Sequence, residues 1–179
     1  DVNFEQYRPH EAGGPIHIIN CCINQTRDDR TGSYNADRKG IALGVSTFGA
    51  ETGTHEPVPC PQLDGMSLAT WVAISGAAAS SGMGSLTRPG LSALLFLSGM
   101  RLGYWWRPTA DRRFGKYRAM LSELLARFPG LRSAGWYVSD GGHFDNTGVY
   151  ALLKRKLSII VLADCGADPR YLFVDLENL

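Results

Sequence analysis

Apolar and polar positions along the chain alternate in a way that predicts strands and helices in mixed order. The apolar runs at 15–23 and 157–163 are short and rich in β-branched residues, a pattern typical of strands buried on both faces. Residues 40–48 form a further apolar run, which predicts a second strand after the first one. A shorter apolar run, 136–138, ends at the acidic residue Asp140 and predicts a strand of its own.

Longer segments with helical spacing lie between these runs. Helices are expected at 64–79, 91–102, 114–128 and 147–156. We expect Asp64 or Ser67 to cap the first of them, because both side chains accept hydrogen bonds from backbone N–H groups. In the third helix the apolar residues recur at intervals of three and four, which predicts a buried face made of Tyr117, Met120, Leu121, Leu124 and Leu125.

Polar and glycine- or proline-rich segments separate these elements. Loops are expected at 24–39, 49–62 and 80–89. The pair Trp105 and Trp106 is interpreted as the close of the second helix.

The order of the last three elements predicts the fold class. A strand, a helix and a second strand between 135 and 163 would form a βαβ unit, with parallel strands joined by a right-handed crossover. We therefore expect an α/β fold with a mainly parallel sheet and helices on both faces. In such a sheet Asp140 and Asp164 would lie at the same edge, because each follows the carboxyl end of a strand.

Composition and charge exclude several classes of protein. The chain has 179 residues, of which 44% are hydrophobic and 20% charged, as expected for one globular domain with a core. A formal charge of +1 gives no broad field that would attract nucleic acid or an anionic membrane. No apolar run approaches the roughly 20 residues of a membrane-spanning helix. The chain begins with Asp and shows no signal peptide, so we expect residues 1–179 to be part of a longer cytoplasmic protein.

The cysteines do not indicate a metal site or a disulfide framework. None of the four forms a C-x-x-C pair, and Cys21 and Cys22 are adjacent residues of one strand. Most lie in apolar or glycine-rich runs, where a thiol behaves as a small hydrophobic group. This usage predicts a reducing compartment.

Residues 135–148 carry the clearest candidate chemistry. Asp140 ends an apolar run, and Gly141 and Gly142 follow it, which predicts a strand that turns tightly into a helix. The glycines are expected to adopt backbone angles closed to other residues and to leave the carboxylate uncovered. Asn146 or Thr147 is expected to cap the next helix.

Residues 139–148 read Ser-Asp-Gly-Gly-His-Phe-Asp-Asn-Thr-Gly, and an apolar run that ends at Asp164 follows them. This order resembles the C-terminal catalytic block of patatin-like lipases, in the branch that contains the cytosolic group IV phospholipases A2. Residues 14–20, with Asn20 on a strand, the small-residue helix 71–78 and the segment 101–105 are similar to further pieces of that family. The resemblance covers most of 15–176.

The resemblance implies hydrolysis of a lipid or phospholipid ester by a Ser-Asp dyad without a cofactor. Asp140 corresponds to the base of the dyad, and Gly141, Gly142 and Asn146 belong to its motif turn. A lipid substrate also implies that the protein could meet a membrane at its periphery, while nucleic acid is not an expected partner.

The chain departs from this family at the nucleophile. The family serine lies in a G-x-S-x-G elbow, and no such sequence occurs among the 179 residues. Ser46 and Ser75 are weak substitutes, because each lacks at least one flanking glycine. We therefore expect residues 1–179 to be the C-terminal portion of one catalytic domain, with the nucleophile in the remaining half of the protein.

Two other functions stay open from the sequence. The chain could be an interaction module that keeps the fold without the dyad. It could also be a metal-dependent hydrolase that uses Asp140, His143, Asp145 and Asp164, because carboxylate and imidazole groups bind several divalent ions.

Overall fold

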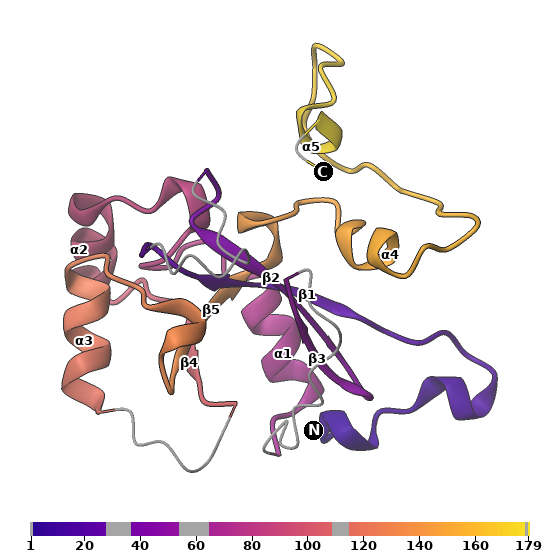
Figure 1. The fold of residues 1–179 in the computed structure, drawn as a ribbon, viewed down its shortest axis with the longest axis horizontal. Helices are drawn as coiled ribbons and strands as arrows, with labels where there is room; N and C mark the ends of the chain where they lie inside the picture. The colour runs from indigo at the N-terminus through magenta and orange to yellow at the C-terminus, as the bar shows by residue number, and fades with distance from the viewer. Residues whose placement is uncertain (1, 28–36, 54–64, 109–114, 178) are drawn as a thin grey trace.

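A fully antiparallel sheet of five strands lies at the centre of the computed structural model, which describes residues 2–27, 37–53, 65–108, 115–177 and 179 (Figure 1). The strands are β1 (Ile19–Asn24), β2 (Gly40–Ser46), β3 (Gly49–Thr52), β4 (Tyr104–Trp106) and β5 (Trp136–Asp140). Their order across the sheet is β3-β2-β1-β5-β4, and every neighbouring pair is antiparallel. The predicted parallel, patatin-like α/β sheet is therefore wrong.

The βαβ unit predicted between 135 and 163 does not form. Its first strand exists as β5, but β1 and β4 pair with the two sides of β5 and leave no free edge for a parallel neighbour. Residues 157–163, predicted as a buried strand, lie in no strand, and the side chain of Val161 is 89% exposed. The helix between them, α4 (Tyr150–Lys154), is only five residues long.

Two of the other predicted strands are confirmed, and two strands were missed. β1 occupies the second half of the predicted run, where Cys21 to Asn24 are all buried, and β2 matches 40–46 of its run. β3 forms at residues 49–52, inside a predicted loop. β4 includes Trp105 and Trp106, which were interpreted as a helix end.

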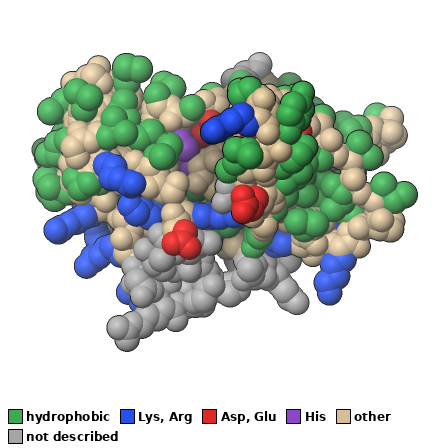
Figure 2. All heavy atoms as spheres, turned by 90° about the horizontal axis from the view of Figure 1, so that it is seen from above, with side chains coloured by type: hydrophobic (Ala, Val, Ile, Leu, Met, Phe, Trp, Pro, Cys, Tyr) green, Lys and Arg blue, Asp and Glu red, His purple; other side chains and the backbone are tan. Residues whose placement is uncertain are grey.

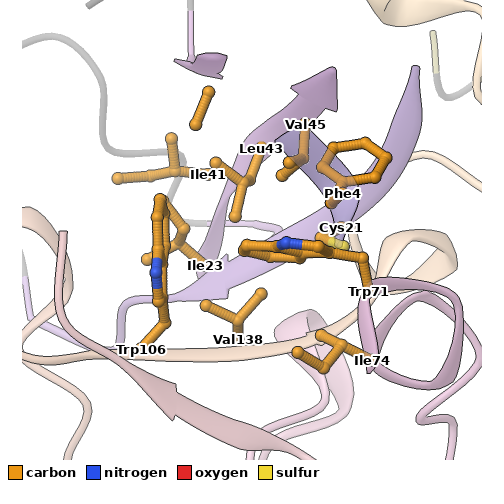
Figure 3. Close-up of a cluster of buried hydrophobic side chains, with 11 residues drawn as sticks. Phe4, Cys21, Ile23, Ile41, Leu43, Val45, Trp71, Ile74, Trp106 and Val138 are labelled. Carbon is orange, nitrogen blue, oxygen red and sulfur yellow. The ribbon is translucent and has the colours of Figure 1, made fainter. Parts of the chain in front are cut away.

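The main core lies between one face of the sheet and α1 (Leu68–Ser75), as Figure 3 shows. Alternate residues of β1, such as Cys21 and Ile23, point to this face. Trp71 of α1 is fully buried and meets the ring of Trp106 edge to face, with 5.1 Å between ring centroids. Ser67 caps α1, since its side chain accepts a hydrogen bond from Thr70 N, whereas Asp64 lies outside the described residues.

The opposite face of the sheet carries a smaller core and more polar contacts. Tyr137 of β5 packs there against Phe128, with ring centroids 4.8 Å apart. The backbone N–H of Ser81 donates to the Tyr137 hydroxyl, and burial raises the pKa of Tyr137 to about 12. The segment after α1 and the segment after α3 (Lys116–Leu124) therefore cover this second face.

The helices α2 (Pro89–Ser98) and α3 pack against each other beside the sheet (Figure 1). Helix α3 presents the opposite face from the one predicted: Tyr117 is 83% and Leu121 56% exposed, while Glu123 is fully buried. Glu123 accepts hydrogen bonds from Ser81 Oγ, Arg101 and Trp105 Nε1, and these fix the rotation of the helix. A buried charge network thus overrides the apolar stripe.

The remaining described elements are short. After α4 the chain leaves the sheet as an extended arm, coloured orange to yellow in Figure 1, which ends in α5 (Val174–Glu177). The 3-10 helices are η1 (Phe4–Gln6), η2 (Pro9–Ala12), η3 (Gly84–Leu86), η4 (Gly130–Arg132) and η5 (Gly141–His143). Within the described ranges, no helix combines the length and the apolar character needed to cross a membrane.

Candidate active site

Asp140 is the last residue of β5 and begins the turn that the sequence singled out. It lies opposite Cys21 of β1 in the antiparallel register and is partly exposed. Its Oδ1 accepts a hydrogen bond of 2.7 Å from Gly142 N and so caps η5. In the described part of the chain no hydrogen bond engages its Oδ2, so this oxygen is available to accept a proton.

Gly141 is needed for space, and neither glycine is needed for an unusual backbone angle. Neither Gly141 nor Gly142 has a positive φ, so the predicted reason for them is wrong. A Cβ at position 141 would lie 2.5 Å from the carbonyl oxygen of Asn20, and one at position 142 would lie 2.7 Å from Asn146 Oδ1. The turn therefore rests directly on β1 at Asn20, whose side chain also donates to the carbonyl of Asp145.

A buried polar network holds the residue before Asp140. Asn24 Nδ2 donates to Ser139 Oγ at 2.7 Å, and Asn24 Oδ1 accepts from Gly84 N. Ser139 Oγ lies 2.8 Å from His143 Nδ1. Because Asn24 supplies a donor to Ser139, the serine proton points to His143, and Nδ1 of that ring is the acceptor.

His143 therefore has a positioning role in this turn. Burial lowers the pKa of its ring below the ordinary value, an effect that the negative charge of Asp140 and a hydrogen bond to the backbone of Ala78 partly offset. The neutral ring bridges Ser139 and Ala78, and so it ties the turn to the chain that follows α1. Ser139 itself is fully buried and cannot reach a substrate.

The carboxylate of Asp145 caps α4. Its Oδ1 accepts from the backbone and hydroxyl of Thr147, and its Oδ2 accepts from Tyr150 N at 2.8 Å. The prediction that Thr147 caps the helix is wrong, since its hydroxyl accepts from Val149 N, which precedes the first residue of α4. Asn146 does not cap the helix: its side chain donates to Asp175 on the C-terminal arm.

The four residues of the metal hypothesis are not gathered into one site. Asp164 is exposed on the C-terminal arm and accepts from Gly166 N, away from the strand edge where the parallel sheet would have placed it. Asp145 and His143 are held by the local bonds described above. Across the described ranges, no group of three or more His, Cys, Asp or Glu side chains is placed to hold a metal ion.

Neither candidate serine is bonded to Asp140. Ser46 closes the β2–β3 turn through Gly49 O and Phe48 N. Asp140 of β5 is opposite Cys21 of β1, which is in turn opposite Leu43 of β2. Ser46 therefore lies two strands away from Asp140 across the sheet and three residues further along β2, roughly 10 Å in each direction. Ser75 lies closer to the turn, but its hydroxyl donates to Asn20 O at 2.7 Å.

The two thiols beside the site are inert. Burial raises the pKa of Cys22 to about 12 and raises that of Cys21 as well, so both stay protonated near neutral pH. Cys165 differs from the prediction because it is exposed, and Cys60 lies outside the described residues.

A mostly polar hollow of about 450 Å³ lies beside the turn, and Gly142, His143 and Phe144 line it. The cation of Arg38 stacks on the ring of Phe144, 4.7 Å from its centroid, and also donates to the carbonyl of that residue. Asp175 and Glu177 of the C-terminal arm line the same hollow, which does not include Asp140.

Sequence reasoning identified Asp140 and its turn but missed Asn24 and Ser139. Their only sequence signal is a polar residue inside an otherwise apolar strand, and the partner of each depends on the strand register. Comparison of the chain with protein-family models, with curated proteins and with solved structures finds no match.

Proposed function

We propose that Asp140 is the general base of a serine acyl hydrolase that cleaves lipid or phospholipid esters. In this proposal the attacking serine comes from a segment outside residues 1–179. The observation that carries it is the state of the Asp140 carboxylate: Gly142 N holds Oδ1, while Oδ2 has no partner among the described residues. The antiparallel sheet lends no support, so the proposal rests on the motif and on the geometry of the turn.

The chemistry needs a fixed carboxylate beside the incoming hydroxyl. Asp140 Oδ2 would take the proton from the serine, whose oxygen attacks the ester carbonyl, and would pass this proton to the leaving alkoxide, so that the alcohol departs and an acyl-enzyme remains. Water then cleaves this intermediate: the same carboxylate takes a proton from the water and returns it to the serine oxygen as the fatty acid leaves. The contacts of Gly141 with Asn20 and of Ser139 with Asn24 and His143 hold the carboxylate in one position.

Labelling with a fluorophosphonate tests the proposal, because this probe reacts with activated serines. The complete protein should label at one serine, and the chain of residues 1–179 should not label. Ser46→Ala and Ser75→Ala should leave the labelling of the complete protein unchanged, because both hydroxyls are engaged elsewhere.

Two outcomes would contradict the proposal. A complete protein that folds but does not label is not a serine hydrolase, and the turn would then belong to a binding module. Labelling that maps to Ser75 would show that this chain supplies its own nucleophile.

A further inference from the structure

The α2–α3 pair carries apolar side chains that no described part of the chain covers. On α2 and just after it these are Leu91, Leu94, Leu97, Met100 and Leu102; on α3 they are Tyr117, Met120, Leu121 and Leu125. On α2 the leucines at 91, 94 and 97 recur every three residues, and along α3 Tyr117, Leu121 and Leu125 recur every four, so each helix presents a stripe. We call these nine residues and their surroundings the α2–α3 surface.

The inward side of both helices explains why these stripes face solvent. Ser92 of α2 is buried, and its hydroxyl donates to Ser81 O. Ser81 in turn donates to the buried Glu123 of α3. Polar contacts therefore hold the two helices against the body of the protein, and the leucine and methionine side chains remain on the outside.

The charge of this region is strongly one-sided. Between residues 65 and 139 the described part of the chain has one acidic residue, Glu123, which is buried and paired with Arg101. The same described residues hold seven basic ones: Arg88, Arg101, Arg107, Lys116, Arg118, Arg127 and Arg132. The whole chain has a formal charge of only +1, whereas, besides the paired Arg101, four of these basic residues lie in α2 or α3 or within three residues of them: Arg88, Lys116, Arg118 and Arg127.

The space-filling view agrees with this distribution. At the end of the molecule formed by α2 and α3, on the left of Figure 2, hydrophobic and basic side chains gather. The acidic side chains visible in that view lie nearer the middle of the molecule.

We propose that the α2–α3 surface binds an anionic phospholipid bilayer, with its apolar stripes in the headgroup region and its basic side chains on the lipid phosphates. Short helices with an apolar stripe and a basic rim lie in the plane of such an interface. A bilayer interface offers an apolar layer to the stripes and phosphates to the basic side chains, whereas nucleic acid would offer phosphates alone. The inference does not rest on the proposed function, because membrane binding needs neither Asp140 nor a serine.

Co-sedimentation with vesicles tests the inference on the complete protein and on its Asp140→Asn variant. Both should bind vesicles that contain phosphatidylglycerol, and both should bind vesicles of pure phosphatidylcholine much more weakly. Binding should weaken further at high salt, since the attraction between a basic surface and anionic lipid is screened.

Paired variants assign the binding to this surface. Leu94→Glu with Leu97→Glu should lower vesicle binding by about tenfold or more, because two leucines no longer enter the apolar layer. Ile159→Glu with Val161→Glu is the matched control, since these side chains are 78% and 89% exposed on the C-terminal arm. Lys116→Gln and Arg127→Gln should each lower binding about fivefold, and Lys156→Gln should not.

Size-exclusion chromatography with light scattering distinguishes membrane binding from self-association through the α2–α3 surface. The inference predicts the same molecular mass for the wild type and for Leu94→Glu with Leu97→Glu. A dimer that becomes a monomer in Leu94→Glu with Leu97→Glu would show that the surface contacts a second copy of the chain. Equal vesicle binding by this variant and by Ile159→Glu with Val161→Glu would show that the surface does not bind the bilayer. Either result overturns the inference.

Discussion

Gly141 sets how closely the Asp140 turn approaches β1. A methyl group at this position would collide with the carbonyl oxygen of Asn20, which belongs to a central strand and cannot move aside. We therefore expect Gly141→Ala to lower the free energy of unfolding by about 1–3 kcal/mol, the usual cost of overpacking. Chemical denaturation measures this difference.

Gly90 provides the matched control for this substitution. A Cβ at that position would meet nothing within 4 Å, and the residue lies in the first turn of α2. Gly90→Ala should be neutral or slightly stabilising. Equal effects of the two substitutions would show that the turn does not press on Asn20.

His143 makes the stability of the turn depend on pH. Burial lowers the pKa of its ring below the ordinary value of 6.5, so on acidification the unfolded chain takes up this proton first. The stability from the neutral, buried ring is therefore complete above about pH 6.5 and is lost as the pH falls towards the folded-state pKa. His143→Asn should flatten the dependence of the unfolding free energy on pH between about 7.5 and 5.5.

The exposed His17 is the control for this measurement. His17 lies before β1 and contacts the hydroxyl of Tyr7 through Nδ1. His17→Asn removes an exposed imidazole, and the slope measured for this variant is the reference for that of His143→Asn. An unchanged slope in His143→Asn would mean that this ring is not buried in its neutral form.

At the residue scale, the sequence predicted what is local and missed what depends on register. A strand that ends at Asp140 and a tight Gly141–Gly142 turn follow from a short apolar run and two glycines. The support from Asn24 and Ser139 does not, because it requires β1 and β5 to be antiparallel neighbours. The role of His143 was missed because its ring also bonds to the backbone of Ala78, which is distant in the sequence.

At the scale of elements, Glu123 decides how α3 is oriented. It is fully buried and accepts from Ser81, Arg101 and Trp105. Glu123→Ala leaves these donors without their acceptor, and we expect a loss of about 3 kcal/mol, at the low end for a broken buried pair because Arg101 retains contact with solvent. Thermal and chemical unfolding measure the loss.

Leu121 gives the complementary test of the same helix. Its apolar spacing predicts burial, but the structure leaves it 56% exposed. Leu121→Ala should therefore change stability by no more than about 0.5 kcal/mol. A cost of several kcal/mol for Leu121→Ala, with little effect from Glu123→Ala, would mean that α3 has the orientation that its apolar stripe predicts.

The existence of the helices could be predicted better than their orientation or ends. Ser67 caps α1 as its side chain and position suggested. The second and third helices are shorter than predicted at one end or both, and Tyr104–Trp106 joins the sheet. Periodicity identifies a helix, but the partner of a buried charge such as Glu123 comes from distant parts of the chain.

At the scale of the whole molecule, the sequence predicted strands but not their neighbours. Residues 157–163 have the composition of a buried strand, and parallel pairing to β5 was the simplest interpretation. That pairing is excluded because β1 and β4 already pair with β5. Strand propensity is a local property, whereas pairing depends on which edges the rest of the chain leaves open.

The most direct test of the central claim is the turnover of an ester by the complete protein and its Asp140→Asn variant. The substitution keeps the size of the side chain and the bond from Gly142 N but removes the proton acceptor, so kcat should fall by at least about 100-fold with folding unchanged. Asp164→Asn, on the exposed arm, should stay within a few-fold of the wild type. Turnover by Asp140→Asn within a few-fold of the wild type would contradict the account.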